Sequence, residues 1–471
     1  MARRVRRRAL ERDTMQTQTV TVWLAVLAGG IALGAAGGER MSFVDNGQIR
    51  VGVDLSIGGA ITHVSDLGRG ENLINSHDWG RQIQMSFYSG PANYQREGKR
   101  KSPAWAGFPW NPIQSGDSFG NGSKTLESRA AGTALYVKSI PMLWPMENDP
   151  GECVFETWID LEGKTFRYRG RLTNQRTDKT VYGPCHQEVP AVYTNAVWHR
   201  LMTYVGDQPF SGGELTEVRK TAQEAWPWSK WLAAENWSAL VDDAGFGIGA
   251  WHPGVFEFHG GFAGARGKGG PKDGPTGYFS PMRTDILDSD IVYEYECVFV
   301  VGTLQEIRDY VYQHAAKDAL PAWVFAKDRQ HWAFLQARSP WPIVDALALE
   351  LDARRARLES PLSYWRAEQA PRLRLRAAFK TRGSELRLFW RSFSGQVHTV
   401  ASWEQWAKTW WTPECSLPLT IVNDGAMHEY VLDLAAVPSY RGALGGLAIE
   451  LPASTDGDRA QIAEIRLERG Q

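Results

Sequence analysis

Short runs in which apolar and polar residues alternate make up most of this chain, and they limit the folds that it can adopt. Positions two apart in an extended chain lie on the same face, so alternation predicts strands with one buried face and one solvated face. Glycine, proline, asparagine and aspartate separate the runs, as turn residues do. The clearest runs lie at 48–55, 81–88, 152–161, 164–173, 238–242, 245–251 and 291–301. Many short strands joined by turns predict an all-β protein with few helices.

Helical periodicity is rare and marks a boundary between two units. The clearest helix is predicted over 304–316, where apolar residues follow helical spacing after an acidic first turn. A weaker helix is predicted over 191–204. A linker containing a proline follows the first helix at 321–329, and a new series of amphipathic strands begins after it. We therefore expect a first β unit over 42–320 and a second β-sandwich over 330–471.

The segment 1–38 has the order of a secretory signal. It begins with the basic run 3–8, continues with the apolar run 22–36 and ends in small residues. The apolar run is shorter than the roughly 20 residues that span a membrane comfortably. We expect a signal peptide and a secreted or periplasmic protein. The alternative is an uncleaved anchor, which would be the protein's one contact with a membrane.

Charge and short motifs exclude several classes of function. Lysine and arginine number 52 against 53 acidic residues, so no basic excess points to a nucleic-acid partner. No phosphate-binding loop or dinucleotide fingerprint occurs in a credible context, which disfavours nucleotides, and no Gly-x-Ser-x-Gly elbow occurs. The four cysteines lack Cys-x-x-Cys spacing, so no zinc site is predicted, although a Cys153–Cys185 disulfide stays open. We expect no metal and no cofactor.

Tryptophan is the unusual residue, with 21 copies. Several stand in turn-rich segments, namely Trp105, Trp110, Trp226, Trp228 and Trp231. Large aromatic rings fill the cores of β-sandwiches, and they also offer flat faces on which a sugar ring can stack. Both interpretations stay open for the loop clusters. They make a poly- or oligosaccharide the partner to consider first.

The stretch from Tyr182 to Tyr193 carries the strongest chemical signal. His186 and Glu188 stand two apart between two prolines, and in an extended chain they share one face. A histidine beside a carboxylate can divide acid and base roles near neutral pH. The same pair also occurs in structural hydrogen-bond networks. The pair alone does not decide between these two interpretations.

Three further segments supply candidate ligands for a sugar. The strand at 81–88 would place Arg81 and Gln84 on opposite faces, and the polar loop after Trp110 offers amide and carboxylate groups that match sugar hydroxyls. The strand that begins at Trp251 adds a third group of polar residues. The candidates for substrate binding are Arg81, Gln84, Trp110, Asn111, Gln114, Asp117, Trp251, His252 and His259, with His186, Glu188, Tyr193 and Glu257 as catalytic candidates. The spacing of His252, Glu257 and His259 does not match a standard zinc motif.

Both units resemble known carbohydrate-related folds. In the first unit, the segments Gly58-Gly-Ala-Ile-Thr-His, Asn72-Leu-Ile-Asn and Glu235-Asn-Trp-Ser-Ala-Leu-Val resemble the β-supersandwich of the galactose mutarotase type. That fold occurs in sugar epimerases and in domains of glycoside hydrolases and polysaccharide lyases. Epimerases of this type use a histidine acid and a glutamate base. The resemblance thus implies His186 for the acid, and Glu257, Glu294 or Glu296 for the base.

The second unit resembles the jelly-roll modules that bind carbohydrate in secreted polysaccharide enzymes. The resemblance is carried by 378–391, by the segment that begins at Asp424 and by the last strand, 462–467. No calcium-binding carboxylates of such modules stand out. The cluster Trp403, Trp406, Trp410 and Trp411 suits either an aromatic platform or a packed insertion.

Together these features predict an exported carbohydrate-active protein that cleaves a glycosidic bond. Hydrolysis needs two carboxyls, for which Glu188 and one of Asp117, Glu235 or Glu257 qualify. Elimination next to a uronate needs an acid, a base and a cation, for which His186, Tyr193 and Arg81 qualify. The alternatives are a glycan-binding protein without catalysis and a structural protein of the cell envelope.

Overall fold

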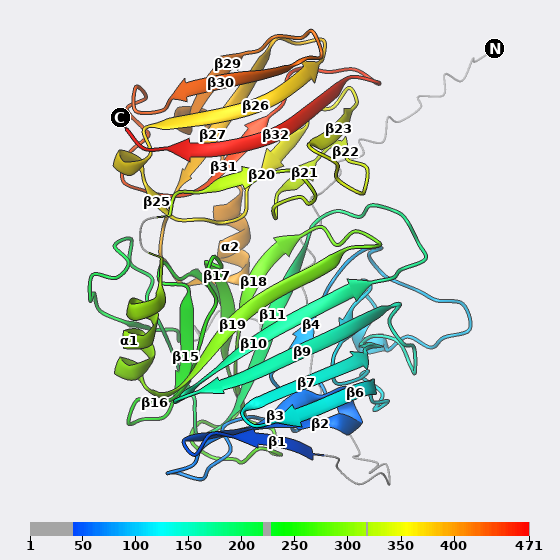
Figure 1. The fold of residues 1–471 in the computed structure, drawn as a ribbon, viewed down its shortest axis with the longest axis vertical. Coiled ribbons are helices and arrows are strands. Elements are labelled where there is room, and N and C mark those ends of the chain that lie inside the picture. The colour runs from blue at the N-terminus through cyan, green and yellow to red at the C-terminus, as the bar shows by residue number, and fades with distance from the viewer. Residues whose placement is uncertain (1–40, 220–227, 317–318, 471) are drawn as a thin grey trace, which may run out of the picture.

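The computed structural model describes residues 41–219, 228–316 and 319–470. Nearly all regular structure in this part of the chain is β-strand, as the alternation predicts. The segment 1–38 and Trp226 lie outside the described residues. Figure 1 shows two β units, the first in blue to green and the second in yellow to red. None of the helices in the described ranges combines the length and the apolar character needed to span a bilayer.

Two large antiparallel sheets form the first unit. The nine-stranded sheet has the order β13 (Thr216–Glu217), β12 (Arg200–Thr203), β15 (Trp237–Val241), β16 (Phe246–Trp251), β19 (Val292–Thr303), β10 (Thr165–Asn174), β9 (Cys153–Glu162), β7 (Ala134–Ile140) and β6 (Lys124–Ala131). The eight-stranded sheet has the order β28 (His398–Thr399), β14 (Ser229–Leu232), β17 (Glu257–Ala263), β18 (Thr276–Asp285), β11 (Cys185–Asn195), β4 (Gln84–Ser86), β5 (Pro112–Ile113) and β8 (Met142–Leu143). A smaller sheet of β1 (Met41–Asp45), β2 (Ile49–Asp54) and β3 (Ala60–Asp66) borders them.

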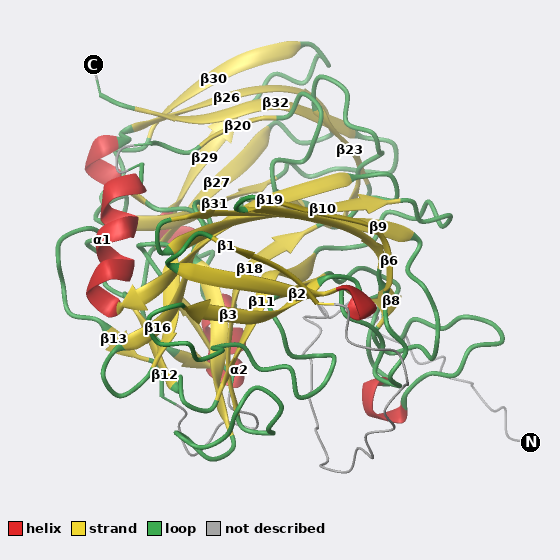
Figure 2. Ribbon diagram, turned by 60° about the horizontal axis from the view of Figure 1, so that its bottom comes forward, coloured by secondary structure: helices red, strands yellow, loops and turns green. Residues whose placement is uncertain are grey.

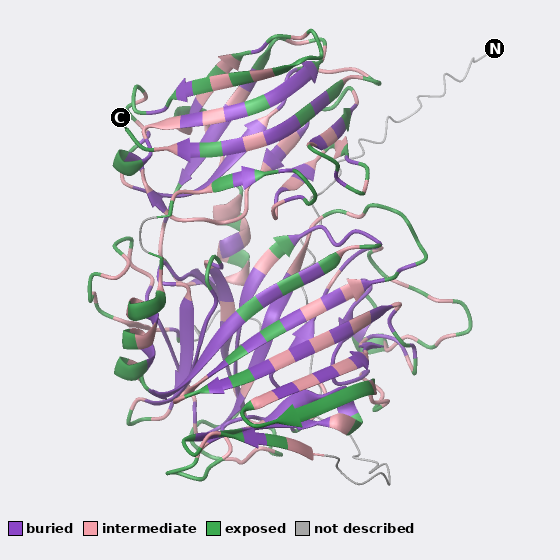
Figure 3. Ribbon diagram, in the orientation of Figure 1, coloured by how far each residue is buried: buried purple, intermediate pink, exposed green. Residues whose placement is uncertain are grey.

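One hydrophobic core joins the two large sheets. Alternate residues of β9 and β10, such as Phe155 and Phe166, meet Met85, Trp231 and Phe279 of the eight-stranded sheet. The other residues of β9, of β10 and of the first half of β19 are partly or fully exposed, which gives the banded strands of Figure 3. Residues 297–302 of β19 are all buried. The outward face of the eight-stranded sheet differs, because its polar residues are mostly buried.

The helix α1 (Leu304–His314) confirms the clearest helix prediction. Thr303 and Glu306 form a capping box at its start, and Ile307 and Val311 are buried beneath it. Figure 2 shows α1 at one side of the sheets. Within the described ranges, the remaining helices are α2 (Val400–Ala407) and the short 3₁₀ turns η1 (Leu55–Ile57), η2 (Pro103–Trp105), η3 (Ala367–Gln369) and η4 (Pro413–Cys415).

The second helix prediction, over 191–204, is wrong. This segment contains the end of β11, a turn, and β12. Val192 lies in β11, Trp198 in the connection after it and Leu201 in β12, and all three are buried in the core. Pairing with β18 and β15 therefore overrides the local pattern.

The second unit is a sandwich of two sheets around its own core. One sheet has the order β22 (Ala337–Arg338), β23 (Leu347–Leu351), β32 (Arg459–Glu468), β26 (Arg372–Lys380) and β30 (Met427–Asp433), with β20 (Ala322–Val324) also on β32. The other has the order β21 (Ala333–Leu335), β24 (Arg357–Glu359), β31 (Ala443–Glu450), β27 (Glu385–Ser392) and β29 (Ser416–Thr420), with β25 (Trp365–Arg366) also on β31. The strand β20 lies within the segment predicted as a linker.

The two units share a sheet. The short strand β28 belongs to the second unit in sequence, but it pairs with β14 of the first unit: Thr399 lies opposite Ser229 and His398 opposite Lys230. The helix α2 follows at once and packs against β14. A segment of the second unit is thereby placed beside the outward face of the eight-stranded sheet.

Candidate active site

Two histidine–glutamate pairs face each other across the central strand β18. His186 and Glu188 come from β11, and Glu257 and His259 come from β17. Both strands pair antiparallel with β18, so they run parallel to one another. The Nε2 atom of His186 lies 3.4 Å from Oε1 of Glu257. The Nε2 atom of His259 lies 3.7 Å from Oε1 of Glu188. We call these four residues the His–Glu quartet.

The register explains why each histidine meets the glutamate of the other strand. Glu188 and Glu257 both stand opposite Met282 on β18, one on each side. Alternation then puts His186 and His259 on the same face as the glutamates. Because the two strands carry the motifs His-x-Glu and Glu-x-His in parallel, each histidine has a carboxylate across β18.

The strand β11 is irregular just after the quartet. Its register on β18 shifts between Glu188 and Val192, and its register on β4 shifts between Glu188 and Ala191. Pro190 lies inside the irregular part, and a proline cannot donate a ladder hydrogen bond. The irregularity lets Tyr193 lie opposite Tyr278 of β18, with the ring centroids 4.5 Å apart. The predicted catalytic residue Tyr193 therefore borders the quartet.

Two tyrosine hydroxyls hold the Glu188 carboxylate. Tyr88 donates to Oε2 over 3.1 Å, and Tyr278 donates to Oε1. The Tyr278 hydroxyl also contacts Nε2 of His259, so it links the two members of the Glu188–His259 pair. The ring of Trp228 lies 4.4 Å from that of Tyr278 and adds an aromatic border.

A lysine completes the charged part of the site. Lys230 on β14 stands directly opposite His259, and its Nζ lies 3.3 Å from Oε1 of Glu257. The ammonium also lies 5.4 Å from the centroid of the Trp403 ring, which comes from α2. The second unit therefore reaches the site through Trp403.

The surroundings keep both glutamates ionised. Burial acts to raise the pKa of Glu257, but Lys230 and His186 outweigh it and lower the pKa to about 2. Burial likewise opposes ionisation of Glu188, and the nearby His259 ring together with the hydrogen bond from Tyr278 brings its pKa below the ordinary value. Neither carboxyl therefore carries a proton near neutral pH.

His259 and the three tyrosines around Glu188 stay neutral near neutral pH. Burial lowers the pKa of His259, against the opposing influence of Glu188. Burial and the Glu188 charge raise the pKa values of Tyr88, Tyr193 and Tyr278 well above the ordinary value. The side chains of His186 and His259 keep exposed fractions of 25% and 18%, so both imidazoles can be reached from outside.

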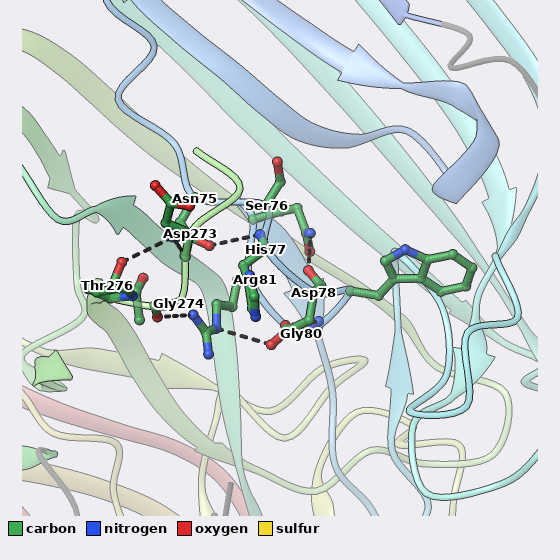
Figure 4. Close-up of polar contacts among 12 residues, drawn as sticks. Asn75, Ser76, His77, Asp78, Gly80, Arg81, Asp273, Gly274 and Thr276 are labelled. Atoms are coloured by element: carbon green, nitrogen blue, oxygen red, sulfur yellow. Dashed lines mark hydrogen bonds and ion pairs between the residues drawn. The ribbon is translucent and has the colours of Figure 1, made fainter. Parts of the chain in front are cut away.

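Arg81 belongs to a neighbouring network that joins two loops. Its Nε lies 3.2 Å from Asp78, and its guanidinium donates to the carbonyl of Gly274. Asn75 donates to the carbonyl of Asp273 over 2.9 Å, and His77 contacts the carbonyl of Lys272 over 2.7 Å. Figure 4 shows Arg81 between Gly274 and the segment that bears Asp78 and Gly80. The Arg81 charge reaches the site, because it acts to lower the pKa of Tyr193.

The predicted loop after Trp110 is built into the protein interior. Trp110, Asn111, Gln114 and Asp117 are all at most 1% exposed. Gln114 donates to the carbonyl of Gly58 and to Thr157, and Asp117 accepts from the backbone of Phe119, Asn121 and Asn148. Gln84 on β4 is also buried and bonds to Trp79, Gln82 and Ser115. These groups already hold internal partners, and the structure does not bring them into the quartet.

Trp251 and His252 lie in two other places. Trp251 packs below α1, where its ring meets Tyr310. His252 is 2% exposed and stacks on Tyr295, and burial lowers its pKa well below the ordinary value. Glu235, a third predicted carboxyl, is fully buried near α1 and accepts hydrogen bonds from Arg308 and Tyr312.

Two residues of the site, Lys230 and Tyr278, escaped the sequence predictions, whereas Trp228 is one of the loop tryptophans considered for sugar stacking. Lys230 has no local pattern that marks it, and Tyr278 sits in a strand that the alternation did not single out. The available signal was the pattern Tyr-x-Ser-x-Met over 278–282, with polar and aromatic groups on one face of a buried strand. No described residues form a group of three or more potential metal ligands. All four cysteines are free, so Cys153 and Cys185 form no disulfide here.

The structure of this chain is similar to several solved structures. A candidate aldose 1-epimerase from Escherichia coli K12 is 13% identical, with a TM-score of 0.36, over 57% of this chain and 100% of that chain. A galactose mutarotase-like protein from Lactobacillus casei is 10% identical, with a TM-score of 0.33, over 55% of this chain and 99% of that one. A low-affinity xylan binding module from Roseburia intestinalis is 10% identical, with a TM-score of 0.22, over 32% of this chain and 96% of that one.

One of these structures carries the name of the galactose mutarotase type, which the sequence of the first unit resembles. No protein-family model and no curated protein matches the chain.

Proposed function

We propose that this protein is an exported enzyme that cleaves a poly- or oligosaccharide by elimination next to a uronic acid. The observation that carries the proposal is the His–Glu quartet with Lys230 beside it. Two reachable imidazoles, each on a buried ionised carboxylate, provide two proton carriers on one face. Trp228 and Tyr193 offer aromatic rings beside these polar groups, a combination that suits a sugar ring.

The charges favour elimination over hydrolysis. Glycoside hydrolysis by two carboxyls requires one of them to be protonated, so that it can donate to the leaving oxygen. Glu188 and Glu257 both have lowered pKa values, and hydrogen bonds and Lys230 keep them ionised. Histidine can take or give a proton in the neutral pH range, and elimination asks for both transfers.

The residues divide the reaction as follows. Glu188 and Tyr278 hold Nε2 of His259, and the tautomer that donates from Nε2 leaves a lone pair on Nδ1 as the base. His259 removes the proton from the carbon next to the uronate carboxylate. The electron pair of that C–H bond forms a carbon–carbon double bond, and the bond from the neighbouring carbon to the glycosidic oxygen breaks. His186, held by Glu257, gives a proton to the leaving oxygen. The Lys230 ammonium stabilises the carboxylate as charge builds up on it.

The test is a panel of neutral and uronic polysaccharides, read by ultraviolet absorbance of unsaturated uronates and by reducing ends. Elimination gives both signals, hydrolysis gives reducing ends alone, and binding without either signal indicates a glycan-binding protein. We expect His259→Ala and His186→Ala each to lower the rate about 10²–10⁴-fold, as loss of an acid or base does.

The matched control is His199→Ala. His199 lies 3.3 Å from the Asp243 carboxylate and has an exposed fraction of 11%, but it stands outside the quartet. Its loss should leave the rate unchanged. Equal activity of all three variants would exclude the proposed roles.

A further inference from the structure

Arg391 is a buried arginine of the second unit whose charge has no partner among the described residues. It stands near the end of β27, is 3% exposed, and lies beside a register shift between Arg391 and Ser392. Leu388 and Trp390 point into the core of the second unit. Arg391, one position further on, is on the opposite face of the sheet.

The guanidinium makes no hydrogen bond. Its Nε, Nη1 and Nη2 atoms are all buried and lack a partner in the described structure. The Trp410 ring lies 3.6 Å and the Trp406 ring 5.5 Å from its central carbon. The faces of these rings attract the cation. They leave all the N–H donors unsatisfied, which is costly for a buried cation.

A second buried arginine, Arg329, has hydrogen-bond partners for its guanidinium. Arg329 is 5% exposed, and its Nε and Nη2 both bond to Asp288 over 2.9 Å. Its Nη1 donates to Ser339 over 2.6 Å. Arg391 has comparable burial and none of these bonds. Burial lowers the pKa of Arg391 to about 9, so the guanidinium is still charged near neutral pH.

Arg391 belongs to the neighbourhood of the candidate active site. Against the effect of burial, the charges of Glu257 and Glu359 both act to raise its pKa. A chain of ring contacts leads the same way: Trp406 stacks on His398, which pairs with Lys230, and Lys230 lies over Trp403. Lys230 already pairs with Glu257 and Arg357 pairs with Glu359, so Arg391 forms an ion pair with neither carboxylate.

We propose that Arg391 forms, together with Lys230, a binding site for the anionic group of an acidic sugar, completed by the second unit. A planar guanidinium with free donors matches a carboxylate, which it can bind through two parallel hydrogen bonds. The inference rests on the proposed function and names the group that recognises the uronate. Because Trp406 and Trp410 cover the guanidinium, these rings move aside when the anion binds.

Binding is measured by calorimetry in the His259→Ala variant, which keeps Arg391 and lacks the proposed base. The probes are uronic oligosaccharides, the same oligosaccharides with carboxyls reduced to alcohols, and sulfated neutral oligosaccharides. We expect uronic probes to bind at least about tenfold more tightly than the reduced ones, and Arg391→Met to remove that difference. A response to sulfated probes alone would assign the site to sulfate and overturn the carboxylate.

Thermal unfolding without ligand separates a binding role from a structural one. Arg391→Met should raise the midpoint, because it removes a buried charge without a partner, whereas Arg329→Met should lower it. Equal binding of charged and reduced probes, or unchanged binding in Arg391→Met, would overturn the inference. Uronate binding that is lost in Arg391→Met, without unsaturated products from the wild type, would keep this site and reject elimination. Unsaturated products from the wild type, with uronate binding that does not depend on Arg391, would support elimination and reject the Arg391 site.

Discussion

Both large sheets of the first unit carry ion pairs on their outward faces, but the pairs are largely exposed on one sheet and buried on the other. On the nine-stranded sheet, Arg171 pairs with Glu156 and Glu294, and the side chains of Arg171 and Glu294 are 32% and 45% exposed. On the eight-stranded sheet, Lys230 and Glu257 are 11% and 5% exposed. Figure 3 shows the difference as exposed bands on β9, β10 and β19.

The two kinds of ion pair differ in their access to water. Water screens the Arg171 pairs, so such pairs contribute little to folding. The Lys230–Glu257 pair has given up its hydration, so each member depends on the other, and each determines the titration of its neighbours. Residue types alone therefore do not mark the site, and burial separates the chemical face from the solvated one.

The largest expected effect is the loss of the Glu257 carboxylate. Glu257→Ala leaves Lys230 buried without its partner, and it should reduce the free energy of unfolding by about 3–5 kcal/mol. Glu294→Ala on the other sheet is the matched control, and it should reduce the free energy of unfolding by at most about 1 kcal/mol. Urea unfolding at neutral pH measures both. Equal losses would show that the two faces do not differ in this respect.

Acid should separate the two faces next. The folded-state pKa of Glu257 is lowered from 4.5 to about 2, so its ionised form stabilises the folded state at pH values above about 4.5. That contribution, up to about 3 kcal/mol, is lost as the pH falls from 4.5 towards 2. Unfolding free energies measured down this range should fall less steeply in Glu257→Gln than in the wild type. Identical slopes would contradict the lowered pKa.

The smallest effect is expected on the nine-stranded sheet. Arg171→Met removes the ion pair with the exposed Glu294 and the ion pair with the half-buried Glu156, and it should change the free energy of unfolding by about 1 kcal/mol. Raising the salt concentration should reduce the difference in unfolding free energy between Arg171→Met and the wild type, because salt screens exposed charges. A loss of unfolding free energy as large as that of Glu257→Ala would show that the Arg171 ion pairs stabilise the fold as strongly as the buried Lys230–Glu257 pair.

Local pattern predicted the elements, and it predicted half of the site. Alternation located β9, β10 and the start of β19, where buried and exposed residues alternate. It also located β2, β15 and β16, whose residues are buried on almost every side. It also put His186 and Glu188 on one face, and both are there. What alternation could not give is the partner across β18, since that depends on the order of strands in the sheet. The pairing of each histidine with the other strand's glutamate is a property of register.

Polar loops were harder to interpret, because hydrogen-bonding groups serve a turn as well as a sugar. Asn111, Gln114 and Asp117 have the composition of a binding loop, yet they hold the loop's own backbone and its neighbours. Lys230 and Arg391 carry no local pattern at all. They come together with Glu257 because a strand of the second unit enters the sheet of the first.

That entering strand, β28, limits how the chain can be engineered. A gene cut at the boundary near residue 320 would remove β28 and α2 from the product. The backbone of β14 would then become an open edge, and Lys230 would lose the Trp403 ring. Open edges invite pairing between molecules. The second unit is therefore not a detachable accessory, and a chimera that exchanges it for another module has to retain 398–411.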